Sequence, residues 1–397
     1  MTNFLAVERA LRTAAPYDLL PAARAALAEH YGAVHVDLLL ADYSCKVLQS
    51  VDGDPADARP VPIRGSAQGR AFDSRERVQM TGYEDSVDLH VPVTAHGDRL
   101  GILVVRLPVP PAGEKVAPHV VDEIIALADI VGHEILVADR DTDVYLQARR
   151  DGRLTLAAEV QWQLLPGRAC ARAEYEIGAQ LEPAYAIYGD NFDWAETETT
   201  LTLGVTNGMG EGIQASLLTS LAVNALRNAR RAGIGIADQA ALADQALFAQ
   251  YRGEEYVATL LLSFDLDTGR VEVVDGGSPQ LWRHRDRTVE HIPFEAQLPL
   301  GMFEETDYVT QEFQVEPGDR LVFVSDGVFA ALSAKGEAFG EKMLARAIQA
   351  ARLLPAAAVP RAILHELSAY LDPEPGPDVD DDALVLCLDW FGRATRP

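Results

Sequence analysis

From residue 170 onward the sequence repeats one pattern, in which a short run of alternating apolar and polar residues ends at a glycine or an acidic residue. A two-residue period of apolar side chains is typical of β-strands with one buried face. Between these runs lie two stretches with apolar residues at three- and four-residue spacing, which predict helices: "IQASLLTSLAVNALRNARRAG" and "GEKMLARAIQAARLL". Many strands combined with long helices predict stacked sheets that are covered by helices.

The N-terminal part of the chain predicts a smaller antiparallel sheet with helices beside it. Apolar spacing predicts a helix over residues 17–30, and alternating runs predict strands in "AVHVDLLLAD" and "KVLQSV". Residues 87–108 predict a hairpin around His96-Gly97-Asp98. The chain has 397 residues, which is long for one core, so we expect a separate N-terminal domain over residues 1–115.

Residues 116–166 predict one long helix, or two abutting helices, that stop at Pro166. A long helix between two domains is often a dimerising coiled coil or a signalling rod, so a homodimer through this helical linker is one expectation. The alternative is a helix that packs on the first domain. Residues 167–392 then form the third predicted part, which makes the whole chain an α+β protein.

The composition is strongly acidic. Lysine and arginine number 34 against 60 aspartates and glutamates, which gives a formal net charge of -26. Such a surface repels nucleic acid and anionic lipid and favours basic partners or metal cations, although an acidic solvated surface explains most of these charges equally well. No apolar run reaches the length of about 18 residues that a membrane helix needs. The three cysteines have no metal or disulfide spacing, which suits a reducing cytoplasm.

Polar and acidic residues recur where the predicted strands of the C-terminal part end. Asp190 and Asp193 lie in "YGDNFDW", Asn207 in "LTLGVTNGMG" and Asp326 in "LVFVSDGV", and residues 380–382 are three aspartates before the last strand. Carboxylates gathered on one rim of a sheet repel each other unless a cation lies among them, and oxygen ligands of this kind suit Mg²⁺ or Mn²⁺. Two such ions can hold a water, lower its pKa and direct it at a phosphoryl group.

Glycines stand beside these positions at Gly189, Gly208 and Gly327. We expect them to let the backbone turn sharply and approach closely. Each motif alone is weak, because "SDG" after a strand is an ordinary turn. Their order along the chain is more specific than any one of them.

The order of "GDNFDW", "TNGMGEG", "NALRNARR", "LVFVSDGV" and "DDDALVLCL" resembles the metal-dependent PPM (protein phosphatase 2C-like) family. It is most similar to the bacterial branch of stage II sporulation protein E and the sigma-B regulator phosphatases, over about residues 165–392. The resemblance implies an αββα β-sandwich between helical layers, with two Mn²⁺ or Mg²⁺ ions at its edge. It also implies dephosphorylation of phosphoserine or phosphothreonine in a phosphoprotein, often an anti-anti-sigma factor. The N-terminal residues resemble a GAF sensor domain, a fold that can take a small-molecule ligand.

The resemblance also assigns the site residues. It implies that Asp190 binds one ion, that position 207 bridges both ions, and that Gly208 offers its backbone carbonyl. Asp326 and Asp381 would bind the other ion. Asp382 is the adjacent alternative, because the triple aspartate leaves the register open by one residue. The expected catalytic residues are therefore Asp190, Asn207, Asp326 and Asp381, and Gly208 and Asp382 complete the expected metal ligands.

The sequence departs from the family at the bridging position, where relatives have aspartate and this chain has Asn207. An amide offers one carbonyl oxygen, so bidentate bridging of two cations is lost. One charge at about 4 Å is worth roughly 4 kcal/mol at a surface-like effective dielectric. Changes in residues that contact the metal ligands, but not the metal itself, reduce metal affinity or activity roughly 10–100-fold. The loss of the bridging ligand should reduce them at least as much.

Two further departures lie in the neighbouring loops. Relatives read Asn-Ala-Gly-His-Pro where this chain has "DGGSP", so Ser278 stands at the histidine position, and Glu211 stands where relatives often carry His or Asn. Three changes in one region favour a natural weakening of the active site over a single engineered substitution. Three functions stay open: a sensor-regulated protein serine/threonine phosphatase, a pseudophosphatase that binds a partner without turnover, and a ligand-binding sensor whose second domain is structural.

Overall fold

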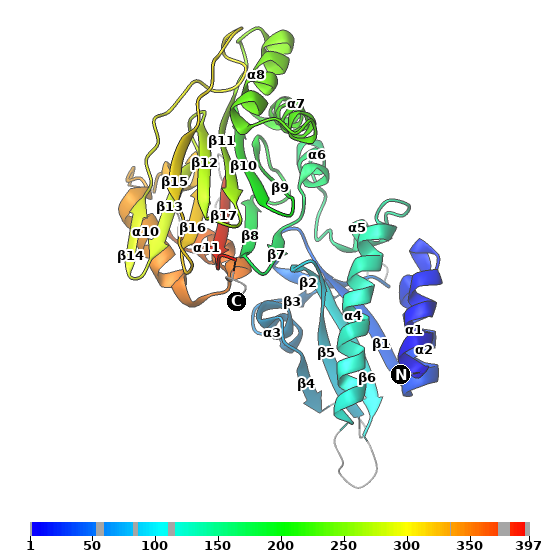
Figure 1. The fold of residues 1–397 in the computed structure, drawn as a ribbon. Coiled ribbons are helices and arrows are strands. Elements are labelled where there is room, and N and C mark those ends of the chain that lie inside the picture. The colour runs from blue at the N-terminus through cyan, green and yellow to red at the C-terminus, as the bar shows by residue number, and fades with distance from the viewer. Residues whose placement is uncertain are drawn as a thin grey trace. The chain divides into compact units, whose positions relative to one another are not determined.

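The computed structural model describes residues 2–52, 59–81, 86–109, 116–333, 335–371 and 382–393 (Figure 1). The chain divides into two compact units, Met1–Arg153 and Leu154–Pro397. The N-terminal unit contains one β-sheet and the C-terminal unit contains two, and each unit has its own hydrophobic clusters.

The N-terminal unit is built on a six-stranded antiparallel sheet with the order β3-β2-β1-β6-β5-β4. The predicted hairpin is confirmed, because β5 and β6 are joined by His96 and Gly97, which both have positive φ as a tight two-residue turn requires. The strands are β1 (His35–Ala41), β2 (Val47–Ser50), β3 (Val61–Pro62), β4 (Val78–Thr81), β5 (Ser86–Ala95) and β6 (Asp98–Pro108). The helices are α1 (Thr2–Thr13), η1 (Pro16–Asp18), α2 (Leu19–Tyr31), α3 (Ala67–Ser74), α4 (Pro118–Ala138) and α5 (Val144–Ala148).

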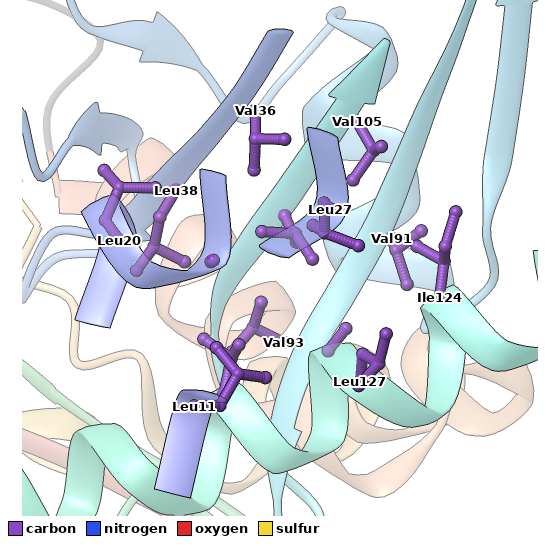
Figure 2. Packing of buried hydrophobic residues seen from close by; sticks show 14 of the residues in the cluster. Leu11, Leu20, Leu27, Val36, Leu38, Val91, Val93, Val105, Ile124 and Leu127 are labelled. Atoms are coloured by element: carbon purple, nitrogen blue, oxygen red, sulfur yellow. The ribbon is translucent and has the colours of Figure 1, made fainter. Parts of the chain in front are cut away.

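Both faces of this sheet are buried. Leu38 and Leu40 of β1 belong to a cluster with side chains of α1, α2 and α4, as Figure 2 shows for ten labelled residues. Their neighbours Leu39 and Ala41 point to the other face and join a second cluster with Phe72 of α3. A strand covered on both faces needs a continuous apolar run, which explains the sequence "VDLLLA".

The structure divides the predicted linker, residues 116–166, differently from the sequence prediction. It contains three helices, and α4 and α5 belong to the N-terminal unit while α6 (Leu156–Leu164) belongs to the C-terminal unit. The reason is packing, because α4 uses its apolar stripe against the sheet of its own unit. A homodimer through this segment stays a prediction. Neither α4 nor any other helix in the described ranges has the length and apolarity needed to cross a membrane.

The C-terminal unit is a sandwich of two antiparallel sheets with helices outside them. One sheet has the order β15-β12-β11-β10-β9 and the other the order β14-β13-β16-β17-β8-β7. The strands are β7 (Ala169–Ala171), β8 (Tyr175–Glu182), β9 (Asp190–Glu196), β10 (Thr200–Gly208), β11 (Val257–Asp265), β12 (Arg270–Asp275), β13 (Gln280–Arg285), β14 (Thr288–His291), β15 (Gln311–Gln314), β16 (Arg320–Val324) and β17 (Ala383–Trp390). The stacked sheets predicted from the sequence are confirmed.

The outer helices of this unit pack as two pairs, one on each sheet. α7 and α8 pack together with side chains of β11 and β12 in one cluster, and α10 and α11 pack against strands of the other sheet in another. The sequence pattern predicted only two helical stretches here, so α8 and α11 correct that expectation. The helices are α7 (Gly212–Arg231), α8 (Ile236–Tyr251), α9 (Asp326–Phe329), α10 (Gly340–Ala350), η3 (Ala351–Leu353), η4 (Ala356–Ala358) and α11 (Val359–Leu371).

The packing of α4 gives a testable prediction about which unit it stabilises. Ile124 is fully buried in the N-terminal core, whereas Leu136 of the same helix is 42% exposed. We expect Ile124→Ala to lower the free energy of unfolding by about 3 kcal/mol, because it leaves a cavity, and Leu136→Ala to change it by less than about 0.5 kcal/mol. Chemical denaturation of the full chain measures both. Equal losses would indicate that the outer face of α4 is covered by a partner.

Candidate metal centre

Asp190 and Asn207 lie side by side at one end of the first sheet. Asp190 begins β9, Asn207 is the penultimate residue of β10, and the two are direct partners in the antiparallel ladder. On its other side Asn207 pairs with Ala258 of β11. Register alone therefore brings these two predicted site residues together at one edge of the sandwich.

The second sheet contributes Asp326 and Asp382 to the same place. Asp326 follows β16 as the first residue of α9, and it accepts a hydrogen bond from the Asn207 amide. Asp382 precedes β17 and is 2% exposed. Its Oδ2 accepts hydrogen bonds from the backbone N–H groups of Tyr188, at 2.6 Å, and Asp190, at 3.2 Å. The contacts of Asp326 and Asp382 with Asn207 and Asp190 thus join strand ends of two different sheets.

Asp381, predicted as the ligand next to Asp382, lies outside the described residues, as does Asp380. Of the two candidate ligands, Asp381 and Asp382, the structure therefore describes only Asp382. Asp382 is already engaged with two backbone N–H groups. Its carboxylate ties the turn before β9 to the start of β17.

The glycines of the site allow close backbone contacts. A Cβ atom on Gly189 would lie 2.0 Å from the carbonyl oxygen of Gly208, and one on Gly327 would lie 1.8 Å from the carbonyl oxygen of Asp382. No side chain fits at such distances, so both positions require glycine. None of Gly189, Gly208 and Gly327 has a φ angle in the left-handed region, so a left-handed turn is not what requires glycine there. Close approach is the reason for these three glycines.

Asn207 has a specific contact in this arrangement. Its side-chain nitrogen donates to Oδ1 of Asp326, across the edge of the sandwich. A carboxylate at the same position would face Asp326 as a like charge, and only a cation between them would make that arrangement favourable. The Asn207 amide therefore satisfies Asp326 by a hydrogen bond from within the protein. Between two carboxylates, a metal ion would be the partner instead.

The donor atoms fit a divalent cation only in part. Asp190, Asp326, Asp382 and the Gly208 carbonyl offer the oxygen atoms that Mg²⁺ and Mn²⁺ prefer, and a bound ion would supply a water of lowered pKa. Across the residues that the structure describes, however, no three His, Cys, Asp or Glu side chains form a cluster that could hold a metal ion. Asn207 occupies the position between the carboxylates. Hydrogen bonds from the Asn207 amide and from two backbone N–H groups join the residues of the centre.

Asp193, the other acid of "YGDNFDW", has a structural role instead. It lies in β9 and pairs with Arg227 at 2.8 Å and Arg230 at 2.9 Å, both on α7. Arg227 also donates to the carbonyl oxygen of Leu164 at the end of α6. The arginine cluster of "RNARR" is thus used largely inside the unit, which supports its interpretation as structural. This network fixes α6 and α7 against the strand that begins with Asp190.

Sequence reasoning missed Gln161, a fully buried polar residue of α6. Its Nε2 donates to the carbonyl oxygen of Tyr188 at 2.9 Å, and its Oε1 accepts from Nδ2 of Asn191 at 2.8 Å. These two partners flank Asp190 on both sides. A polar residue within the apolar stripe of "LAAEVQWQL" was the available signal, because a buried amide needs specific partners.

The loop with Ser278 lies at the same end of the first sheet. Gly276 donates its N–H to the carbonyl oxygen of Thr259, which is next to the Ala258 that pairs with Asn207. Asp275 accepts the N–H of Gly277, and burial raises the pKa of the Asp275 carboxyl above its ordinary value. Ser278 has a positive φ of 51°. The second predicted departure from the family is therefore a neighbour of the first in space.

The comparisons with known proteins agree with this geometry. The family described as Stage II sporulation protein E (SpoIIE) matches residues 197–391. The SiaA-PP2C domain of Pseudomonas aeruginosa has the same fold, with a TM-score of 0.50 and 20% identity, and the match covers 59% of this chain and 93% of that one. The C-terminal unit therefore has the PP2C fold, and most of it is similar to the SpoIIE family.

Two curated relatives come from Bacillus subtilis (strain 168). Phosphoserine phosphatase RsbU is 21% identical over 211 residues, which are 53% of this chain and 62% of RsbU. Phosphoserine phosphatase RsbP is 23% identical over 180 residues, which are 44% of each protein. The matched region thus spans less than two thirds of either relative. The GAF-like interpretation of the N-terminal unit stays a prediction.

The Asp193 network gives a prediction about the support of the site. We expect Asp193→Asn to lower the free energy of unfolding of the C-terminal unit by about 3 kcal/mol, because two partly buried guanidinium groups lose their carboxylate. The matched control is Arg231→Ala, which removes an exposed arginine from the same cluster. Thermal unfolding of the full chain, followed by circular dichroism, compares them. Equal stability of the two variants would contradict the role given to Asp193.

Proposed function

We propose that this chain is a metal-dependent protein serine/threonine phosphatase that acts on a phosphoprotein. The observation that carries the proposal is the meeting of Asp190, Asp326 and Asp382 at one edge of a PP2C-fold sandwich. Support comes from the named activity of two relatives, which are both called phosphoserine phosphatases. Anti-anti-sigma factors are the proposed substrate class, and Mn²⁺ or Mg²⁺ the proposed cofactor.

In this proposal Asp190 and Asp326 hold the cation and Gly208 adds its carbonyl oxygen. Asp382 has two tasks, because its Oδ2 already fixes the N–H groups of Tyr188 and Asp190. A bound ion would lower the pKa of a water, so that this water could lose its proton near neutral pH and act as the nucleophile. The remaining contribution of the protein is orientation, since α7 holds Gly189 through a 2.7 Å hydrogen bond from Thr219.

The contact between Asn207 and Asp326 favours a second candidate function. In a pseudophosphatase the same site would bind a phosphoprotein or a regulatory partner without turnover. The amide satisfies Asp326 without a cation and removes one negative charge from the centre. Both effects reduce the affinity for a second ion, because bridging needs an anionic ligand. The choice between the two candidates therefore depends on whether the centre binds its ions with an amide at position 207.

An activity measurement separates the candidates. Hydrolysis of para-nitrophenyl phosphate is measured while Mn²⁺ is titrated, for the natural chain and for Asn207→Asp. We expect the aspartate to raise turnover roughly 10–100-fold and to lower the Mn²⁺ concentration for half-maximal activity. Asn224→Asp, on an exposed position of α7, adds the same charge away from the centre and should change neither quantity.

The outcomes have distinct meanings. Turnover by the natural chain that Asn207→Asp increases only modestly makes it an enzyme that tolerates an amide at the bridge. Turnover by the variant alone makes the natural chain a pseudophosphatase. If neither protein hydrolyses the substrate at any Mn²⁺ concentration, the proposed phosphatase function is wrong.

We further propose that the N-terminal unit regulates the centre through α6. This helix directly follows the boundary between the units at Arg153 and Leu154. Gln161 of α6 contacts Tyr188 and Asn191, which lie on either side of Asp190 in the chain. Trp162 donates to the carbonyl oxygen of Ala184 at 2.7 Å. A shift of α6 that breaks these bonds would move the backbone that carries Asp190. A ligand of the N-terminal unit can act in this way only if α6 has two positions and the ligand binds the protein more tightly when α6 is in one of them.

The regulatory contact is tested on the active background Asn207→Asp. We expect Gln161→Met to keep the size of the side chain, to lose both amide contacts, and to raise the half-activating Mn²⁺ concentration about tenfold. The matched control is Gln163→Met, two residues away on the exposed face of α6. Unchanged Mn²⁺ dependence in the Gln161 variant would exclude α6 as the route to Asp190.

A further inference from the structure

The C-terminal unit contains a fully buried carboxylate that the proposed centre does not use. Asp244 of α8 has no exposed surface. Its Oδ1 accepts the backbone N–H of Gly301 at 2.7 Å and the hydroxyl of Tyr308 at 3.3 Å. Burial raises the pKa of this carboxyl, and the two hydrogen bonds oppose that shift. A buried carboxyl group is unfavourable without specific partners, so these contacts, together with those from Thr306, retain it.

The partners of Asp244 belong to the segment between β14 and β15, which lies along the edge of the candidate centre. Leu300, just before Gly301, exchanges two 2.9 Å backbone hydrogen bonds with Val257 at the start of β11. Val257 is in turn the ladder partner of Gly208. The neighbouring Met209 donates its N–H to the carbonyl oxygen of Tyr256 at 3.3 Å. Two backbone pairings therefore separate Gly301 from Gly208.

The turn at Gly301 has little freedom to adjust. Its φ is +91°, and a Cβ atom there would lie 2.6 Å from the Cβ atom of Leu247 on α8. The hydroxyl of Tyr308 shares its single proton between Asp244 and the carbonyl oxygen of Leu298, at 3.1 Å, which closes the segment on itself. Leu300 and Tyr308 are buried in the same cluster as Leu247. The segment is thus fixed to α8 by packing and by one carboxylate.

We propose that Asp244 is a positioning residue of the candidate centre, which holds Leu300 and Gly301 against β11 and thereby fixes the backbone of Gly208. Asp244 does not itself bind the ion or the substrate. Its effect on metal binding rests on the proposed function, in which the Gly208 carbonyl is a ligand. Its effect on the backbone of the rim does not depend on any activity.

Hydrogen–deuterium exchange of the full chain tests the backbone effect. We expect Asp244→Asn to speed the exchange of the amides of residues 300–301 and 208–209 about tenfold, which corresponds to about 1.4 kcal/mol of local stability. Tyr308→Phe removes a single donor to Asp244 and should speed the same amides less. This second variant keeps the proposal testable if Asp244→Asn does not fold.

The matched control is Asp319→Asn. Asp319 is also buried, is held by Arg285 at 2.6 Å, and precedes β16 at the end opposite Asp326. The Asp319→Asn substitution should leave the amide hydrogen exchange of residues 208–209 unchanged. If the Asp244 and Tyr308 variants also leave these amides unchanged, or if the control speeds them equally, Asp244 is only a structural residue and the proposal is wrong.

Calorimetry with Mn²⁺ tests the consequence at the centre, with Asn207→Asp compared with the double variant Asn207→Asp/Asp244→Asn. We expect the second change to raise the half-saturating Mn²⁺ concentration several-fold, whereas Asn207→Asp/Asp319→Asn should bind as Asn207→Asp does. Equal binding by all three would overturn the link to the ion. If Asn207→Asp itself binds no Mn²⁺, the proposed metal centre fails, and the exchange experiment alone decides the role of Asp244.

Discussion

Two close backbone approaches hold the edge of the sandwich together, and the candidate centre depends on them. Gly189 lies against the Gly208 carbonyl, and Gly327 lies against the Asp382 carbonyl. The first approach closes the β9–β10 end of one sheet, and the second joins α9 to the start of β17. Asp382 then bonds to N–H groups next to β9, so the ends of the two sheets are joined. Any side chain at these two glycines would separate the residues that the site needs together.

The electrostatics of the edge follow from this packing. Asp190, Asp326 and Asp382 are brought together in a chain that already carries a formal net charge of -26. Carboxylates so placed need positive partners, and here backbone N–H groups and the Asn207 amide provide some of them. An aspartate at position 207 would leave this requirement to cations. The replacement of one oxygen by an NH₂ group therefore affects both the stability of the metal-free site and its affinity for ions.

The supports behind the centre come from three helices with different origins in the sequence. Thr219 and the two arginines of α7 hold Gly189 and Asp193. Gln161 of α6 holds the residues on both sides of Asp190, and Asp244 of α8 holds the segment beside Gly208. All of these contacts are made by buried or half-buried polar groups, for which a lost partner is costly. The position of each site strand thus depends on a helix.

The sequence by itself determined the period of many strands, the antiparallel character of the N-terminal sheet, and the set of residues at the strand ends. Period two along "TLTLGVTNG" is a local property, and so is the turn at His96 and Gly97, because each follows from neighbouring residues. The Ala-rich α8 and the helix α11 were missed, since a helix with many small residues has a weak apolar pattern. For α4 the sequence left two alternatives open, a linker helix between the domains and a helix packed on the first domain.

Only the tertiary structure decided which polar residues meet. Asp190 and Asp193 lie three residues apart on one strand, yet the first lies beside Asp382 at the edge of the sandwich and the second pairs with arginines of α7. Asn207 meets Asp326 across 119 positions of sequence, and Gln161 meets Asn191 across 30. Such contacts depend on how two sheets and their helices pack, and no local pattern encodes that packing. The residue types were determined by the sequence, and their partners were determined by the fold.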